Sequence, residues 1–334
     1  MPSLAQARTA NEAHFAVHGE AIPVAVFIGG TSGIGEAMVA AFGHYTKGNA
    51  HIAVIGRNRD AGERILSILP KPQNPSLIPQ RVFIPCDVSL MKNVLAAANE
   101  IKAKFTKINY LILSTGLVDM DERTETAEGL EKKLSVSYYS RWLFIKEFVG
   151  LVEQAIVQDG PGRGVVSSIL APGHGGEIKS EDWEIKHGYS PGKVRTTAVT
   201  YNDLMVEAWA DHHPKVPFVH AHPGIVRTPL FFRSPSYFAK FMGLLLVSLA
   251  RFMTISSEES AEWMWYTINL THTRIIDNSE STRGRESKPV GSWRTDPFGA
   301  DKAKDDKYFG STEKKDGLWL HTEEAISRSV NANF

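Results

Sequence analysis

The segment Ile28-Gly29-Gly30-Thr31-Ser32-Gly33-Ile34-Gly35 follows a short apolar run at 24–28 and leads into a stretch with helical spacing of apolar residues. A strand that turns directly into a helix brings backbone amides and the positive end of the helix dipole against an anion. Here Gly29 allows the tight turn, Gly33 lets the backbone approach a pyrophosphate, and Gly35 allows close helix packing. The segment predicts a nucleotide-binding turn; a purely structural glycine turn is the alternative. The candidate contacts in it are Gly29, Thr31, Ser32, Gly33 and Ile34.

Short β-branched runs alternate with longer amphipathic stretches through the first two thirds of the chain. The predicted strands are 24–28, 52–55, 81–84, 110–113, 165–169 and 218–221, and the predicted helices lie near 34–46, 60–69, 90–105, 129–157 and 194–211. Parallel strands need crossover connections, and short apolar strands need cover on both faces. The pattern therefore predicts an α/β fold with a doubly wound parallel sheet of the Rossmann type.

The last hundred residues have a different character. Residues 236–253 are apolar on most sides and 254–270 follow the cluster Ser256-Ser257-Glu258-Glu259, so both predict helices. Residues 277–316 are polar and rich in Gly, Pro, Lys and Asp, which predicts loops. We expect a single domain over 1–334, with a core at about 22–230 and a helical C-terminal extension at about 231–334 that covers a substrate.

Composition narrows the class of protein. The chain has 43% apolar residues, which can bury a substantial core, and a net charge of zero, which does not suggest a nucleic-acid partner. A single cysteine, Cys86, fits a reducing compartment. No apolar stretch reaches membrane-spanning length, and the N-terminus lacks the apolar region of a signal peptide. We expect a soluble, cytoplasmic protein; the sequence leaves open whether it is a homo-oligomer.

The glycine segment resembles the TGxxxGIG fingerprint of the short-chain dehydrogenase/reductase family, with Ile28 in place of the threonine. Later segments follow that family's order and spacing over about residues 22–230. The phrases EGLEKKLSVSYYSRW, TYNDLMVEAWA and VPFVHAHPGIVRTPL resemble a divergent branch that is common in filamentous fungi and often found near natural-product pathways. The resemblance implies a nicotinamide cofactor and oxidoreductase activity.

The residues after the second predicted strand bear on the choice of cofactor. An enzyme that prefers NAD places an acidic residue there to hold the ribose hydroxyls. This chain has Gly56 at that position and Arg57 beside it, so a 2′-phosphate would meet a cation. The pattern favours NADP(H), with an ordinary surface arginine as the alternative.

The resemblance implies further cofactor contacts at the ends of later strands. Asp87 and Val88 match the family's adenine-contacting pair. Ser114-Thr115-Gly116 stands where the family has N-A-G, so Gly116 is expected to line the cofactor although the asparagine is absent. Pro223, Gly224 and Thr228 match the segment that holds the nicotinamide carboxamide.

The family's chemistry uses a serine, a tyrosine and a lysine four residues beyond the tyrosine. A tyrosine with a pKa near 10 is a poor base at neutral pH, and a lysine cation one helical turn away favours its phenolate. Tyr189 and Lys193 have this spacing, and Lys193 would also contact the ribose. However, the intervening Pro191-Gly192 is also typical of a β-turn, which would leave Lys193 away from Tyr189.

The catalytic serine is harder to place. Ser168 fits a serine at the end of its strand, but counting from the start of the strand puts Ile169 or Leu170 at the catalytic position. The family's helix asparagine falls at Ser137, and a serine cannot supply an amide there. His220 and His222 share one face of a strand without an evident third ligand, so we expect no metal site.

These observations predict an NADP(H)-dependent reductase or dehydrogenase. It would act on the carbonyl or alcohol of a hydrophobic small molecule of natural-product size, with Tyr189 as acid/base, Lys193 as its electrostatic partner and Ser168 orienting the carbonyl. One alternative keeps the fold but uses Tyr189, His174 or His222 in non-redox acid/base chemistry, as in an isomerase, cyclase or lyase. Another is an NADP-sensing protein without enzymatic activity.

Overall fold

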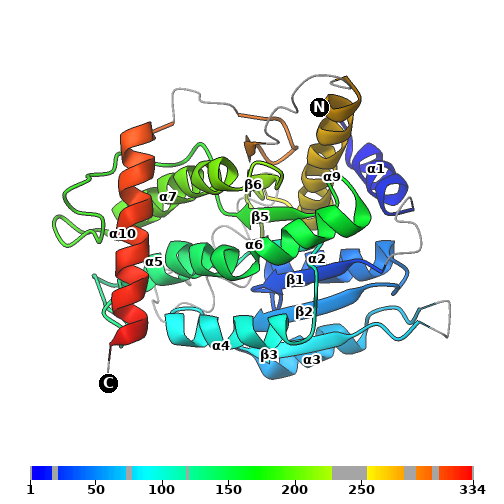
Figure 1. Cartoon of the computed structure of the whole chain (residues 1–334), viewed down its shortest axis with the longest axis horizontal. Coiled ribbons are helices and arrows are strands. Elements are labelled where there is room, and N and C mark those ends of the chain that lie inside the picture. Colours follow the sequence, from blue (N-terminus) through cyan, green and yellow to red (C-terminus); the bar gives the residue numbers. More distant parts are fainter. Residues whose placement is uncertain are drawn as a thin grey trace.

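The computed structural model describes residues 2–16, 22–72, 77–117, 120–227, 254–281, 291–302 and 308–332. In this part of the chain seven strands form one parallel sheet in the order β3-β2-β1-β4-β5-β6-β7 (Figure 1). All six predicted strands are present, as β1 (Val24–Ile28), β2 (His51–Gly56), β3 (Arg81–Pro85), β4 (Tyr110–Leu113), β5 (Val165–Ile169) and β6 (Phe218–Ala221). Helices cover both faces, which confirms the doubly wound parallel sheet.

The seventh strand, β7 (Ser292–Thr295), was not expected. It pairs in parallel with β6, with Val219 opposite Trp293, and extends the sheet at that edge. The prediction of loops over 277–316 is therefore wrong in part, since the range also includes the end of α9 (Ser257–Ser281) and the start of α10 (Thr312–Asn331). The segment Ser-Trp-Arg-Thr is not an apolar run like the other strands, and its pairing depends on the edge that β6 offers.

One face of the sheet is covered by α1 (Leu4–Ala16), α2 (Gly33–Tyr45) and α9, with α3 (Arg59–Ser67) beside α2. An aromatic cluster joins the three helices to the sheet. The Trp265 ring on α9 stacks on Phe42 with centroids 5.3 Å apart, and Phe15 and Tyr110 meet it edge-on. The helix predicted at 254–270 is thus present as the longer α9, and its tryptophan is core.

The other face carries α4 (Met91–Lys102), α6 (Ser140–Asp159) and α7 (Pro191–His212). A short helix, α5 (Lys132–Leu134), and a π-helix, η1 (Ser135–Tyr139), lead into α6. The C-terminal helix α10 crosses outside this layer and packs on α7 and α4 (Figure 1). Its Trp319 meets the rings of Trp142 on α6 and Trp209 on α7 at 5.2 and 4.7 Å. The C-terminal extension therefore supplies helices to both faces of the sheet.

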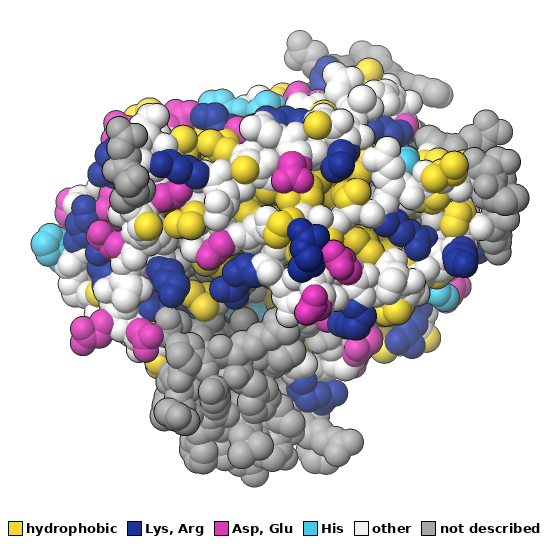
Figure 2. All heavy atoms as spheres, turned by 90° about the horizontal axis from the view of Figure 1, so that it is seen from below, with side chains coloured by type: hydrophobic (Ala, Val, Ile, Leu, Met, Phe, Trp, Pro, Cys, Tyr) yellow, Lys and Arg dark blue, Asp and Glu magenta, His cyan; other side chains and the backbone are white. Residues whose placement is uncertain are grey.

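Three further features are the segment 236–253, the absence of membrane-spanning helices among the described ones, and the surface charge. The helix predicted at 236–253 lies outside the described residues. None of the helices that the structure does describe combines the length and apolar character needed to cross a membrane. On the face shown in Figure 2, Lys and Arg side chains are interspersed with Asp and Glu, in keeping with the net charge of zero.

Candidate cofactor site and active site

The glycine turn between β1 and α2 has the backbone that its sequence predicts. Gly29 and Gly33 have φ angles of +93° and +59°, a region that residues with a Cβ rarely adopt. A Cβ on Gly29 would lie 2.9 Å from the backbone nitrogen of Thr115, and one on Gly35 would overlap the carbonyl oxygen of Gly29. The turn therefore needs glycine at these positions, and it leads directly into the N-terminus of α2, which begins at Gly33.

The end of β2 has no acidic side chain. A Cβ on Gly56 would lie 2.9 Å from the methyl group of Thr31, so Thr31 fills the space that a larger residue at 56 would need. Arg57 is exposed and forms no ion pair with the described residues, whereas Arg59 pairs with Glu63 at 2.9 Å. Arg57 is thus a cation close to the turn that has no acidic partner in the described part of the chain.

The ends of β3 and β4 complete this half of the site. The Oδ1 atom of Asp87 accepts hydrogen bonds from the backbone nitrogen and the hydroxyl of Ser89, at 3.0 and 2.8 Å, while Val88 is buried. The hydroxyl of Ser114 donates to the carbonyl of Ile28 at 3.2 Å, which ties the end of β4 to the end of β1. Gly116 follows as an exposed residue. The carboxyl ends of parallel strands meet at one edge, so these residues share an edge with the glycine turn.

The segment after β6 lies at the same edge of the sheet. Gly224 has a φ of +83°, and the hydroxyl of Ser260 on α9 donates to the carbonyl of Pro223 at 2.8 Å, which fixes the segment. The backbone nitrogen of Gly224 donates to Nδ1 of His222 at 2.9 Å. Thr228, the last predicted cofactor contact, lies outside the described residues.

The structure does not bring Lys193 to Tyr189. Pro191 and Gly192 lie in the first turn of α7 rather than in a β-turn, and Ser190 caps that helix by accepting from the backbone nitrogen of Lys193 at 3.1 Å. Tyr189 therefore precedes the helix instead of lying one turn below Lys193. The ammonium of Lys193 donates to the carbonyl of His187 at 2.8 Å.

A different lysine approaches Tyr189. The Nζ atom of Lys133, on α5, lies 2.9 Å from the Tyr189 hydroxyl and also donates to the carbonyl of Asp121 at 3.0 Å. The Tyr189 hydroxyl donates to Oε1 of Glu131 at 3.1 Å. Lys133 and Glu131 are both buried. Sequence reasoning missed this group, because nothing in the segment at 131–133 shows which distant tyrosine it meets.

Ser168 is not placed to orient a substrate carbonyl. Its side chain is fully buried and contacts residues of α6 and α7. Its hydroxyl accepts from Nη1 of Arg141 at 2.6 Å and donates to Oδ1 of Asn202 at 2.7 Å. Both capacities of the hydroxyl are used in the core, so we do not keep the catalytic assignment of Ser168.

A side-chain amide from another element bonds the backbone of Ser137. Ser137 lies within η1, and its carbonyl accepts from Nδ2 of Asn202, on α7, at 2.9 Å. The same Nδ2 atom also donates to the carbonyl of Ala198. π-Helical turns occur often near functional sites, and this one exposes a carbonyl that α7 satisfies. Asn202 was not among the predicted site residues.

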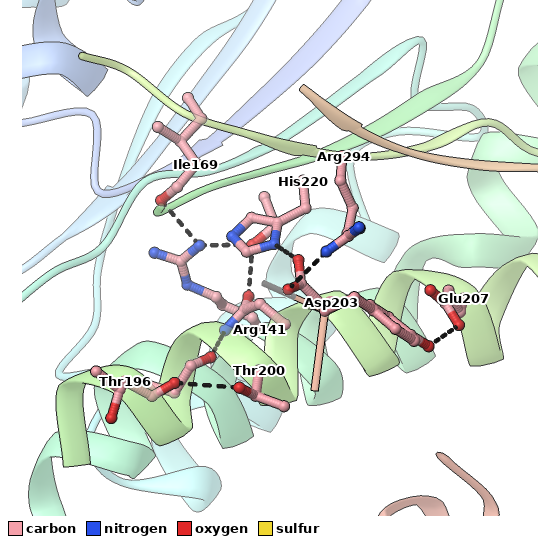
Figure 3. A network of polar contacts seen from close by, with 12 residues as sticks. Arg141, Ile169, Thr196, Thr200, Asp203, Glu207, His220 and Arg294 are labelled. Atoms are coloured by element: carbon pink, nitrogen blue, oxygen red, sulfur yellow. Dashed lines mark hydrogen bonds and ion pairs between the residues drawn. The ribbon is translucent and has the colours of Figure 1, made fainter. Parts of the chain in front are cut away.

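Four side chains of α7, spaced at 196, 200, 203 and 207, lie along one face of the helix (Figure 3). Among them, Asp203 is bonded by His220 Nδ1 at 2.7 Å and by Arg294 at 3.4 Å. Burial lowers the pKa of His220, and the Asp203 carboxylate opposes this shift. No group of three or more potential His, Cys, Asp or Glu ligands occurs among the described residues.

His222 and His174 form a pair at the strand ends, with ring centroids 4.9 Å apart. Burial, followed by the neighbouring His174, lowers the pKa of His222 to about 4. The ring is therefore neutral at physiological pH. Because Nδ1 accepts the Gly224 amide hydrogen, the ring proton lies on Nε2.

Comparisons with known proteins agree with this geometry. A family model described as short chain dehydrogenase matches residues 23–155. The oxidoreductase AN1596 of Emericella nidulans is 31% identical over 74% of this chain and 72% of its own length. The oxidoreductase andH of Emericella variicolor is also 31% identical, over 80% of this chain and 74% of its own length.

Solved structures show the same fold at lower identity. The L-sorbose reductase of Gluconobacter frateurii, complexed with NADPH and L-sorbose, superposes with a TM-score of 0.55 at 16% identity, over 84% of this chain and 97% of that one. The NADPH-bound carbonyl reductase from chicken fatty liver has a TM-score of 0.53 at 14% identity, over 84% and 98% of the two chains. With the glycine turn, the parallel sheet and the fungal relatives in agreement, this chain belongs to the short-chain dehydrogenase family of oxidoreductases.

Proposed function

We propose that this oxidoreductase uses NADP(H) and interconverts a carbonyl and an alcohol on a hydrophobic small molecule of natural-product size. The observation that carries the cofactor choice is Arg57, an exposed cation that has no ion pair with the described residues and follows Gly56. A carboxylate at the end of β2 would repel a 2′-phosphate, whereas a guanidinium can bond it through two N–H groups. The apolar character of residues 236–253 supports the substrate class.

The residues at the strand ends fit a dinucleotide. The positions of Gly29 and Gly35 have no room for a Cβ, which leaves backbone amides free to approach a pyrophosphate at the N-terminus of α2. Asp87 and Val88 end the half of the sheet that would hold the adenine, and Pro223 and Gly224 end the other half. When bound, the nicotinamide would supply or accept the hydride.

Tyr189 is the acid/base group of this proposal, with Lys133 in the role first given to Lys193. The Lys133 ammonium, 2.9 Å from the tyrosine oxygen, would stabilise a phenolate after the proton leaves. Glu131 accepts a hydrogen bond from the tyrosine hydroxyl and holds it in position. A substrate oxygen would replace Glu131 as the acceptor of that proton.

Calorimetric titration with NADPH and NADH tests the cofactor choice. We expect NADPH to bind more tightly, and Arg57→Gln to weaken NADPH about ten- to hundredfold, the range for a bond to a charged group, without changing NADH. Arg59→Gln is the matched control, because Arg59 is two residues away and is already paired with Glu63. An unchanged preference for NADPH in Arg57→Gln would exclude the role of Arg57. If the wild type binds neither NADPH nor NADH, the proposed function is excluded.

A second candidate function rests on His222. A neutral ring with a fixed Nε2–H at the end of β6 is a suitable hydrogen-bond donor for non-redox acid/base chemistry on a carbonyl. Turnover of a substrate with no change in nicotinamide absorbance, lost in His222→Phe, would favour this function over the first.

A further inference from the structure

Arg141, on α6, is a fully buried cation in the core behind the strand ends. Its Nη1 atom donates to the Ser168 hydroxyl at 2.6 Å and to the carbonyl of Ile169 at 3.0 Å. Its Nη2 atom donates to the carbonyl of Thr115 at 2.5 Å. Its Nε atom has no hydrogen-bond partner in the described part of the chain, and no described carboxylate pairs with the guanidinium.

The groups around Arg141 do not neutralise it. Asp203 already bonds both His220 and Arg294 (Figure 3). Burial lowers the pKa of His220, the Asp203 carboxylate opposes this shift, and Arg141 and Arg294 add to it. Glu207, the other carboxylate on this face of α7, bonds the Tyr308 hydroxyl at 2.7 Å. Arg141 therefore keeps its charge with no described carboxylate in contact with it. Burying a charge costs free energy, so a buried cation is retained where hydrogen bonds offset that cost or where the charge serves a function.

The carbonyls that Arg141 bonds show where this charge acts. In a doubly wound sheet each half binds one half of a dinucleotide, and the halves meet where the strand order reverses. Here the order reverses between β1 and β4, and the glycine turn, Arg57 and Asp87 all belong to the β1–β3 half. The nicotinamide end therefore belongs over β4, β5 and β6. Thr115 lies two residues after β4 and Ile169 ends β5, so the guanidinium lies directly behind this half.

We propose that the buried Arg141 guanidinium makes the site discriminate between the two redox forms of the cofactor, with the reduced form bound more tightly. The oxidised nicotinamide ring carries one positive charge and the reduced ring carries none, so only the oxidised form is repelled. In a poorly solvated interior this repulsion extends over several ångströms. The inference rests on the proposed function in one respect only, that the site binds NADP(H).

The Arg141 charge would also affect how readily the oxidised cofactor leaves after each turnover. In carbonyl reduction the carbonyl carbon gains the hydride with its electron pair, the oxygen gains a proton from the acid group, and the cofactor is left oxidised. A site that holds the oxidised form weakly releases it readily. Arg141 would thus favour a reductive cycle in which NADPH enters and NADP⁺ leaves.

The test compares dissociation constants for NADPH and NADP⁺, measured by calorimetry without any substrate. We expect Arg141→Met to reduce the ratio of NADP⁺ to NADPH dissociation constants about tenfold, a change that a unit charge at about 10 Å can produce. A tenfold change in this ratio equals about 30 mV in the potential of the bound two-electron couple. Arg141→Lys keeps the charge and should keep the ratio. Lys146→Met removes an exposed cation from the same helix and should leave the ratio unchanged.

The ratio separates an electrostatic role from a purely structural one. If Arg141 only ties the ends of β4 and β5 together, Arg141→Met weakens both cofactor forms equally, and an unchanged ratio overturns the proposal. Should Arg141→Met fail to fold, Asp203→Asn gives a test of opposite sign, because removing the buried anion should raise the ratio. An unchanged ratio there also overturns the proposal. Failure of the wild type to bind either form would instead overturn the proposed function.

Discussion

The ammonium of Lys133 lies 2.9 Å from the hydroxyl oxygen of Tyr189, although 56 positions separate the two residues in the chain. Lys133 belongs to the short helix before η1, and Tyr189 belongs to the loop before α7. The ammonium also lies 5.4 Å from the centre of the tyrosine ring. The cation that the sequence predicted one helical turn beyond Tyr189 is thus supplied by a different helix, α5.

This relationship predicts which lysine matters for catalysis. Lys133→Met should lower kcat for NADPH-dependent reduction of a hydrophobic diketone such as 9,10-phenanthrenequinone about a hundredfold, because the phenolate loses its stabilising cation. The dissociation constant for NADPH should not change. The matched variant Lys193→Met removes an ammonium that bonds the His187 carbonyl, and should cost much less in kcat. If Lys193→Met is the more damaging of the two in steady-state kinetics, the assignment of Lys133 is wrong.

The sequence predicted the six main strands because each is a short apolar run with clear ends. It missed β7, since a run of Ser-Trp-Arg-Thr contains a charged residue that is buried in the fold. That burial depends on Asp203, which lies 91 residues earlier in the chain. Local pattern cannot show such a partner.

The candidate site was likewise predicted only in part from the sequence. The glycine turn was readable because its function lies in consecutive backbone conformations, which Gly29 and Gly33 adopt. The acid/base group was not, because the contacts of Ser168 and Tyr189 come from residues on other elements. Ser168 lies one position before the end of β5, and the alternation of side chains along the strand turns it toward Arg141 and into the core.

Gly35→Ala should abolish or severely weaken cofactor binding. The added Cβ would overlap the Gly29 carbonyl oxygen and lie 2.5 Å from the Ser114 hydroxyl, so α2 must move away from the turn. Gly150→Ala is the matched control, because it lies on the exposed side of α6 and a Cβ there meets nothing within 4 Å. The control should bind NADPH normally and gain about 0.5–1 kcal/mol in the free energy of unfolding. Normal NADPH titration of Gly35→Ala would contradict the close packing of this turn.

The packing of α10 predicts that alanine substitutions at two nearby leucines change the free energy of unfolding by very different amounts. Leu318 is a buried residue of α10, 1% exposed, and Leu320, two residues later on the same helix, is 62% exposed. Leu318→Ala should lower the free energy of unfolding by about 2–5 kcal/mol, through lost burial and a cavity. Leu320→Ala should stay within about 0.5 kcal/mol of the wild type. Urea unfolding of the two variants measures both values, and equal effects would show that α10 does not pack on α7 in solution.

His321 on α10 predicts a loss of stability in mild acid. Its Nε2 atom lies 2.8 Å from the Tyr139 hydroxyl, and burial lowers the pKa of the ring to about 4 from an ordinary value of 6.5. Between these values the unfolded chain binds the proton and the folded chain does not, so stability falls as the pH drops below about 6.5 and levels off below about 4. From pH 7 to pH 5 this group alone should remove about 1–2 kcal/mol. His321→Gln cannot titrate but can still bond Tyr139, and urea unfolding at the two pH values should show a pH dependence smaller by that amount. Since other buried histidines titrate equally in both proteins, an unchanged pH dependence in His321→Gln would mean that the ring is accessible to protons in the folded state.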